Sequence, residues 1–135
     1  MIVDLEEKTE SGVFDIKGGG KVHVRLLTST DLKVIRKACV TKVVEYPLLG
    51  EGSEKKYQRF EFENLDAELF NTMSWDLGIT GWENIFDKNK KPIPVTKENK
   101  TLLMVLSPEF KEAVDNGFKA LKEAEKAKAG AEIKN

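Results

Sequence analysis

Histidine and cysteine often act as nucleophile, base or metal ligand, and this chain of 135 residues holds one of each. His23 falls on the polar side of a predicted strand, where it alternates with Val22 and Val24. Cys39 falls on the apolar side of a predicted helix, which is the usual place of a small core residue. The sequence therefore offers no nucleophile–base pair, and we predict that the protein is not an enzyme.

Two loops contain parts of known ligand-binding motifs. Three glycines at 18–20 precede Lys21, as in a phosphate-binding loop, but that motif needs a hydroxyl and then a helix. Here Val22 and a predicted strand follow the lysine. From Asp87 to Glu98 the sequence approaches a calcium loop, but a lysine and a proline replace the oxygen ligand and the glycine that the motif needs. We therefore expect no cofactor and no metal.

Four basic residues gather in the first predicted helix, namely Lys33, Arg36, Lys37 and Lys42. They are candidates for contacting nucleic acid. However, the chain has 22 basic and 23 acidic residues, and a net charge of −1 gives no long-range attraction for a phosphate backbone. We interpret the cluster as a solvated helix face.

Trp75, Trp82 and Phe86 are candidate protein-binding residues, because exposed aromatic side chains mark interfaces. The alternative is that they close an edge of the core, as a tryptophan near a helix end often does. Trp75 is the better interface candidate, since it falls nearly opposite the apolar side of its predicted helix.

Length and composition predict one domain, because 135 residues with 40% hydrophobic content can form a modest core. We expect this domain to span residues 1–128 and residues 129–135 to form a disordered tail. No apolar run approaches the roughly 20 residues of a membrane span. The acidic N-terminus lacks the basic and apolar regions of a signal peptide. One cysteine cannot form an internal disulfide, so the expected location is a reducing cytoplasm.

Hydrophobic periodicity predicts a mostly helical α+β fold, in which an N-terminal β-hairpin packs with about four helices. The hairpin strands are Val13–Ile16 and Lys21–Leu27. The four predicted helices are Thr28–Tyr46, Asn64–Leu77, Thr96–Leu106 and Pro108–Lys128. The predicted N-caps are Thr30 for the first helix, Thr96 for the third and Ser107 for the fourth.

Two segments between the predicted helices are assigned less regular structure. Leu48–Lys56 is a predicted loop, and the alternation in Tyr57–Phe62 fits either a short strand or irregular chain. The predicted core is one cluster formed by Leu69, Met73, Phe110, Val114 and Phe118.

The order of these features resembles the tail assembly chaperones of long-tailed bacteriophages and prophages. The likeness covers roughly Val22–Val114, and the stretches that carry it are KVHVRLLTSTDLKVIRK, WDLGITGWENI, PIPVTKENK and PEFKEAV. Relatives commonly carry a glycine in the turn before the proline segment, where Lys90 and Lys91 stand here.

The resemblance implies a non-enzymatic role in the bacterial host cytoplasm. Such proteins hold the tape-measure protein, a long helical and aggregation-prone chain, in solution while tail-tube subunits polymerise around it. The role needs no cofactor and is compatible with a homo-oligomer. Two other functions stay open: a structural tail-completion or head–tail connector protein of the virion, and a small nucleic-acid-binding regulator.

Overall fold

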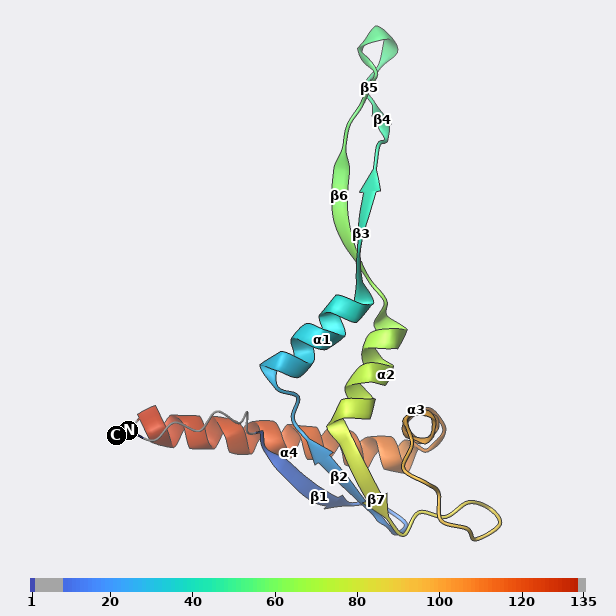
Figure 1. Cartoon of the computed structure of the whole chain (residues 1–135), viewed down its shortest axis with the longest axis vertical. Coiled ribbons are helices and arrows are strands. Elements are labelled where there is room, and N and C mark those ends of the chain that lie inside the picture. The colour runs from blue at the N-terminus through green and yellow to red at the C-terminus, as the bar shows by residue number, and fades with distance from the viewer. Residues whose placement is uncertain (2–8, 134–135) are drawn as a thin grey trace.

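A three-stranded antiparallel sheet with the strand order β1–β2–β7 lies at the lower end of the molecule in Figure 1. The structure is a computed structural model that describes Met1 and residues 9–133, without the side chains of residues 129–133. Strands β1 (Ser11–Asp15) and β2 (Lys21–Arg25) confirm the predicted hairpin. The glycines at 18–20 have φ angles of 95°, 119° and 90°, so the turn requires residues without a side chain.

The third strand, β7 (Ile79–Glu83), pairs with β2 and is absent from the predicted elements. A register shift between His23 and Val24 interrupts the ladder. As a result, Ile79 and Trp82 are both buried at a spacing of three residues, which hides the alternation typical of a strand. The strand also begins directly after a helix, so no turn residue separates the two elements.

Helix α4 (Pro108–Ile133) packs along β1 and β2 and completes the core. Gly117 permits this close approach, because a Cβ there would lie 2.8 Å from Phe14 Cδ2 and 3.0 Å from Val24 Cγ2. The core cluster comprises Ile16, Val22, Val24, Leu26, Ile79, Trp82, Met104, Phe110, Ala113, Val114 and Leu121.

The predicted core cluster is confirmed only in part. Phe110 and Val114 are buried, and Phe118 is half-buried against the cluster. Leu69 and Met73 lie outside it, because the helix that carries them also packs against a second helix on its other side. There, Met73 Sδ lies 3.9 Å from Cys39 Sγ.

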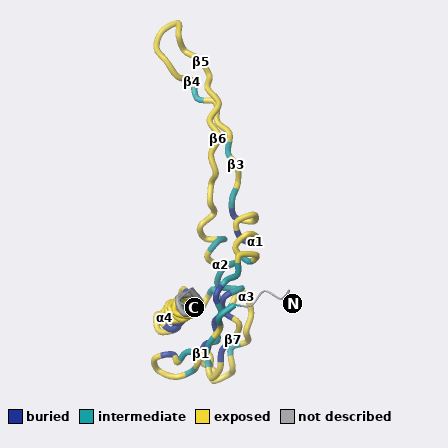
Figure 2. The backbone as a smooth tube through the Cα atoms, turned by 90° about the vertical axis from the view of Figure 1, so that its left-hand side faces the viewer, coloured by how far each residue is buried: buried dark blue, intermediate teal, exposed yellow. Residues whose placement is uncertain are grey.

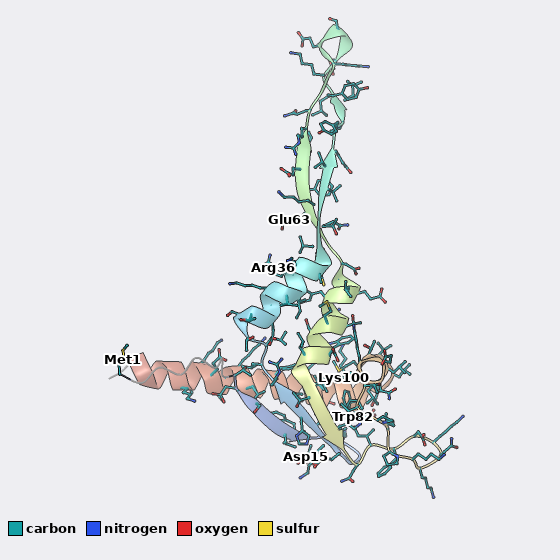
Figure 3. All side chains as sticks on the ribbon, in the orientation of Figure 1. Met1, Asp15, Arg36, Glu63, Trp82 and Lys100 are labelled. Atoms are coloured by element: carbon teal, nitrogen blue, oxygen red, sulfur yellow. The ribbon has the colours of Figure 1, made fainter. Side chains whose placement is uncertain are left out.

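Helices α2 (Ala67–Gly78) and α3 (Lys97–Leu106) pack against each other, and α3 also packs against α4. Lys100 joins the first pair, since its Nζ donates to the Asp76 main-chain oxygen at 2.8 Å and to Asp76 Oδ1 at 3.1 Å (Figure 3). Two of the three predicted caps are confirmed, since the hydroxyls of Thr96 and Ser107 accept main-chain hydrogen bonds at the starts of α3 and α4.

Helix α1 (Ser29–Cys39) is shorter than predicted, and a strand begins at the next residue. The predicted continuation to Tyr46 is wrong because Val40–Glu45 forms β3, which pairs antiparallel with β6 (Phe60–Leu65). Three of the six residues of β3 are valine, which favours strand over helix. The N-cap is Thr28 rather than the predicted Thr30.

Strands β3 and β6 form an arm (residues 40–65) that projects from α1 and α2, away from the sheet (Figure 1). The predicted loop Leu48–Lys56 is the outer part of this arm. It contains β4 (Leu48–Leu49), a short 3₁₀ helix at Gly52–Glu54, and β5 (Lys56–Tyr57). The alternation near Tyr57–Phe62 is therefore strand, shifted a few residues along the chain.

We call the sheet β1–β2–β7 together with α3 and α4 the body, and the C-terminal end of α4 extends beyond the rest of it. Residues 122–128 are all exposed, and Lys128 Nζ lies 3.6 Å from Glu10 Oε1. The helix continues past the predicted end at Lys128 to Ile133, and residues 134–135 of the predicted disordered tail lie outside the described residues. Within the described chain, no helix is both long enough and apolar enough to cross a membrane.

Candidate functional site

The arm is exposed along most of its length (Figure 2), and it carries an unusual number of large apolar side chains. Each is between 40% and 74% exposed. They are Val44, Tyr46, Leu48, Leu49, Tyr57, Phe60, Phe62 and Leu65. Scattered single apolar residues are normal on a protein surface, but a contiguous set on a projecting element is typical of a binding surface.

The register of the arm separates its side chains into two faces. Directly opposed residues share a face. One face carries a single charge and holds Thr41, Val43, Glu45, Phe60, Phe62 and Asn64. The opposite face is charged: Lys42 Nζ lies 3.3 Å from Glu61 Oε1, and Arg59 Nη1 lies 3.7 Å from Glu61 Oε2. The first face therefore offers aromatic contacts, and the second keeps the arm hydrated.

Both strands of the arm are also edge strands, because β3 and β6 form a two-stranded sheet. An edge strand presents unpaired main-chain donors and acceptors that can pair with another chain. The arm therefore has two means of binding a partner, through apolar side chains and through strand addition.

A hollow of about 320 Å³ lies where the arm joins the two helices. We call it the base hollow. Its apolar lining comes from Leu32 of α1, Phe70 of α2, and Val40 and Leu65 at the start and end of the arm. Val40 and Leu65 in this lining are the cross-strand pair nearest to the two helices.

Charged groups surround the base hollow. Arg36 and Glu63 belong to its lining and lie at the junction of α1 and the arm (Figure 3). An adjoining depression is lined by these two residues, Val40, and two further cations, Lys37 and Lys42. The predicted basic cluster is therefore not simply a solvated helix face, because part of it borders an apolar hollow.

Trp75 lines a different hollow, of about 380 Å³, between α2 and α4. It is half-buried and packs against the core, with Phe118 and Leu26 in the same lining. Asp115 and Lys122 supply charge at the edge of this hollow. Trp75 is thus partly accessible, as predicted, but it is also a structural residue, because α2 packs on two sides rather than one.

Trp82 and Phe86 have different surroundings. Trp82 is only 9% exposed; its Nε1 donates to the Ile93 main-chain oxygen at 2.9 Å, and its ring meets Phe110 edge to face at 5.8 Å. It fixes the connector, the segment of residues 84–96 between β7 and α3, to the core, so the core alternative describes it. Phe86 is 54% exposed beside the connector turn, so it is the most accessible of the three.

Helix α3 presents a second exposed apolar stripe. Leu102, Val105 and Leu106 are spaced as neighbours on one helix face and are 52%, 67% and 73% exposed. Apolar residues at this spacing are suited to contact another helix. The helix over this run is predicted from the sequence, but the exposure of these three side chains is not.

Asp87 organises a tight turn in place of the calcium loop. Its Oδ1 accepts hydrogen bonds from the main-chain nitrogens of Asn89 at 2.8 Å and Lys91 at 3.1 Å. A carboxylate oxygen that accepts main-chain hydrogen bonds from the residues that follow it stabilises a turn. Over the residues that the structure describes, no group of three or more His, Cys, Asp or Glu side chains is placed to hold a metal ion.

Cys39 lies on α1 and His23 lies on β2, and no hydrogen bond between described residues joins the two side chains. Burial raises the pKa of the Cys39 thiol, with a smaller contribution from Asp66, so the thiol stays protonated and unreactive. His23 Nε2 lies 3.6 Å from Glu83 Oε2 on the exposed side of the sheet.

The candidate binding residues that the sequence-based prediction missed are those of the arm. The signal for them was present: VTKVVEY is rich in β-branched residues, and FEFEN alternates strictly. No protein-family model, curated protein or solved structure matches this chain.

Proposed function

We propose that this chain is a tail assembly chaperone of a phage or prophage. It binds the tape-measure protein during tail assembly in the bacterial host cytoplasm and performs no catalysis. The observation that carries the proposal is the projecting arm, whose large apolar side chains are exposed to solvent. The order of sequence features supports the same role by resemblance.

The physical requirement of such a chaperone is reversible covering of apolar helices. The aromatic face of the arm and the exposed stripe of α3 are two surfaces suited to this task. The body supplies solubility, because the exposed half of α4 alternates acidic and basic residues. Neither surface needs a metal, a nucleotide or a reactive side chain.

The direct test is co-expression with the genes that neighbour this one, including the tape-measure gene, followed by pull-down on a tagged chain. The proposal predicts that tape-measure protein, insoluble when expressed alone, becomes soluble and co-purifies with the chain. A tape-measure protein that stays insoluble at equal expression of the chain would contradict it.

A structural component of the virion, such as a tail-completion or head–tail connector protein, is the second candidate. The two free edges of the arm favour it, because they suit strand pairing with a neighbouring subunit of a ring. Mass spectrometry of purified particles separates the two candidates. A chaperone is absent from the finished particle, whereas a connector is present in a fixed number of copies.

A further inference from the structure

We propose that the base hollow is the site that selects the partner, and that it takes an acidic amphipathic helix. In this arrangement an apolar anchor of the helix enters the hollow, and carboxylates on its flanks meet the cations at the border. This inference rests on the proposed function in one respect only: the helix is assigned to the chaperone's partner.

The first argument is the lining of the hollow. Its apolar residues come from two helices and from both strands of the arm, and Leu32 and Leu65 remain 40% and 50% exposed. A site walled by side chains on several elements accepts another side chain, whereas an open strand edge accepts main chain. The hollow therefore fits an apolar anchor side chain, and an amphipathic helix presents such a side chain with polar groups on its flanks.

The second argument is charge. Arg36 and Lys37 are exposed, and neither takes part in any ion pair between described residues. Lys42, the third cation at this border, already pairs with Glu61. Two cations beside an apolar hollow complement a helix whose anchor is flanked by Asp or Glu.

A simpler role for the two cations is that they stabilise the C-terminal end of α1, whose last turn they occupy. That role explains their sign but gives no reason for the apolar hollow beside them. It also predicts a different experimental result: changes at Arg36 and Lys37 would alter stability and leave binding untouched.

Glu63 is the one acidic group that lines the hollow, and it provides a sharp test. No ion pair joins it to Arg36 in the described chain, so its charge remains at the border. If the ligand is acidic, Glu63 opposes binding. Replacing it with glutamine should then strengthen binding, an outcome that loss of structure cannot imitate.

The probes are two synthetic helices of about 20 residues with the same leucine stripe, one with glutamate flanks and one with lysine flanks. Fluorescence anisotropy measures the binding of each to the full chain. We expect the acidic helix to bind at least about tenfold more tightly than the basic one. Arg36→Glu with Lys37→Glu should weaken the acidic helix by about tenfold, and Glu63→Gln should strengthen it about two- to threefold.

The matched control is Lys119→Glu with Lys126→Glu on the exposed side of α4, which makes the same change in net charge at residues outside the lining of the base hollow. It should leave binding unchanged. Thermal melting by circular dichroism checks that each variant is folded. Arg36→Gln with Lys37→Gln, a milder change, should weaken binding by a smaller factor if the reversed pair fails to fold.

Several results would overturn the inference. These are equal binding of the two helices, no effect of the charge changes at the hollow, or an equal effect from the α4 control. A self-associated chain that dissociates on Arg36→Glu, seen by light scattering, would assign the hollow to a second copy instead. Binding of duplex DNA lost in the same variant would assign it to nucleic acid.

The inference and the proposed function fail separately. If tape-measure protein co-purifies equally with the wild-type chain and the Arg36→Glu, Lys37→Glu variant, the function stands and the inference falls. If the charge preference for peptides is found but tape-measure protein does not co-purify, the inference about the hollow stands and the proposed function falls.

Discussion

Asp31 joins the sheet to the first helix through three hydrogen bonds. Its Oδ2 accepts from Arg25 Nη1 at 2.8 Å and from the Thr28 main-chain nitrogen at 3.0 Å, and its own nitrogen donates to Thr28 Oγ1. The Arg25 hydrogen bond, followed by that from the Thr28 backbone, lowers the pKa of the Asp31 carboxyl below its usual 3.8. The charged carboxylate is therefore stabilised by folding.

This pKa shift gives a prediction about pH. The stabilisation is complete above the unfolded pKa of about 3.9 and is lost as the pH falls through the lower folded value. Asp31→Asn should cost about 1 kcal/mol at pH 7, and the cost should shrink as the pH falls below 3.8. Urea unfolding of both proteins at pH 7, 5 and 3 measures it. A cost that does not change with pH would mean that the charge of Asp31 is unimportant.

Lys90 occupies a backbone conformation that glycine prefers, with a φ of 62°. Its nitrogen donates to the Asp87 oxygen at 3.0 Å, and the Asp87 nitrogen donates to the Lys91 oxygen at 2.9 Å. This is the three-residue hairpin loop that usually ends in a left-handed glycine. The lysine is thus the strained residue of the connector turn.

Lys90→Gly should raise the free energy of unfolding by about 0.5–1 kcal/mol, because relief of the left-handed strain exceeds the added entropy of the unfolded chain. Lys88→Gly is the control, since Lys88 lies in the same turn without a positive φ and should gain nothing. Equal effects of the two substitutions in thermal unfolding would contradict this account.

The aromatic candidates show how far the burial of a single side chain can be predicted from the sequence. Periodicity separates the apolar side of a helix from the rest, so it marks Trp75 as unusual, but it assumes that a helix packs on one side. Helix α2 packs against α1 and against the body, so Trp75 is half-buried. Trp82 is buried because β7 joins the sheet, a pairing between residues distant in sequence.

Helix α4 and the sheet approach each other closely at Gly117. A methyl group at this position would meet Phe14 and Val24 at 3.0 Å or less. Gly117→Ala should therefore destabilise the protein by about 1–3 kcal/mol from overpacking, less the gain of about 1 kcal/mol in helix propensity. Net destabilisation in urea unfolding is the expected result.

Asn116→Ala is the control for Gly117, because Asn116 is exposed on the same turn of α4. It gains helix propensity without meeting the sheet, so it should be neutral or slightly stabilising. If Gly117→Ala behaves in the same way, the sheet and α4 are packed more loosely than the structure indicates.

The arm is the element that sequence reasoning predicted least well. The apolar positions from Leu32 to Cys39 follow a helical period, and Val43 and Tyr46 happen to continue it. The strand preference of the valines and the pairing with Phe60–Leu65 decide the outcome. By contrast, the hairpin, the last two helices and their caps follow from local signals and were predicted correctly.

The whole molecule divides its tasks between a body and a projecting arm. Most of the buried residues lie in the body, whereas the arm is mostly exposed (Figure 2). The arm also holds most of the exposed aromatic residues of the described chain. Within the described chain no residue of the arm belongs to the buried core cluster, so the arm adds little to the core. When two strands of a small protein form an exposed arm outside the core, we expect the arm to bind a partner.

Trimming the arm tests this division. Since Glu45 pairs with Phe60, residues 46–59 can be replaced by Asn-Gly, a two-residue hairpin turn that keeps the first rungs and the base hollow. The trimmed chain should melt within a few degrees of the wild type, because the removed residues have no share in the core. A large loss of stability in circular dichroism would mean that the arm supports the body.

Co-purification of tape-measure protein with the wild-type and the arm-trimmed chain, expressed at equal levels, is the most direct test of the central claim. The account predicts that the wild-type chain keeps tape-measure protein soluble and bound, and that the trimmed, folded chain loses at least about 2 kcal/mol of this affinity. Equal recovery of tape-measure protein with both chains would contradict the claim that the arm is the partner-binding element.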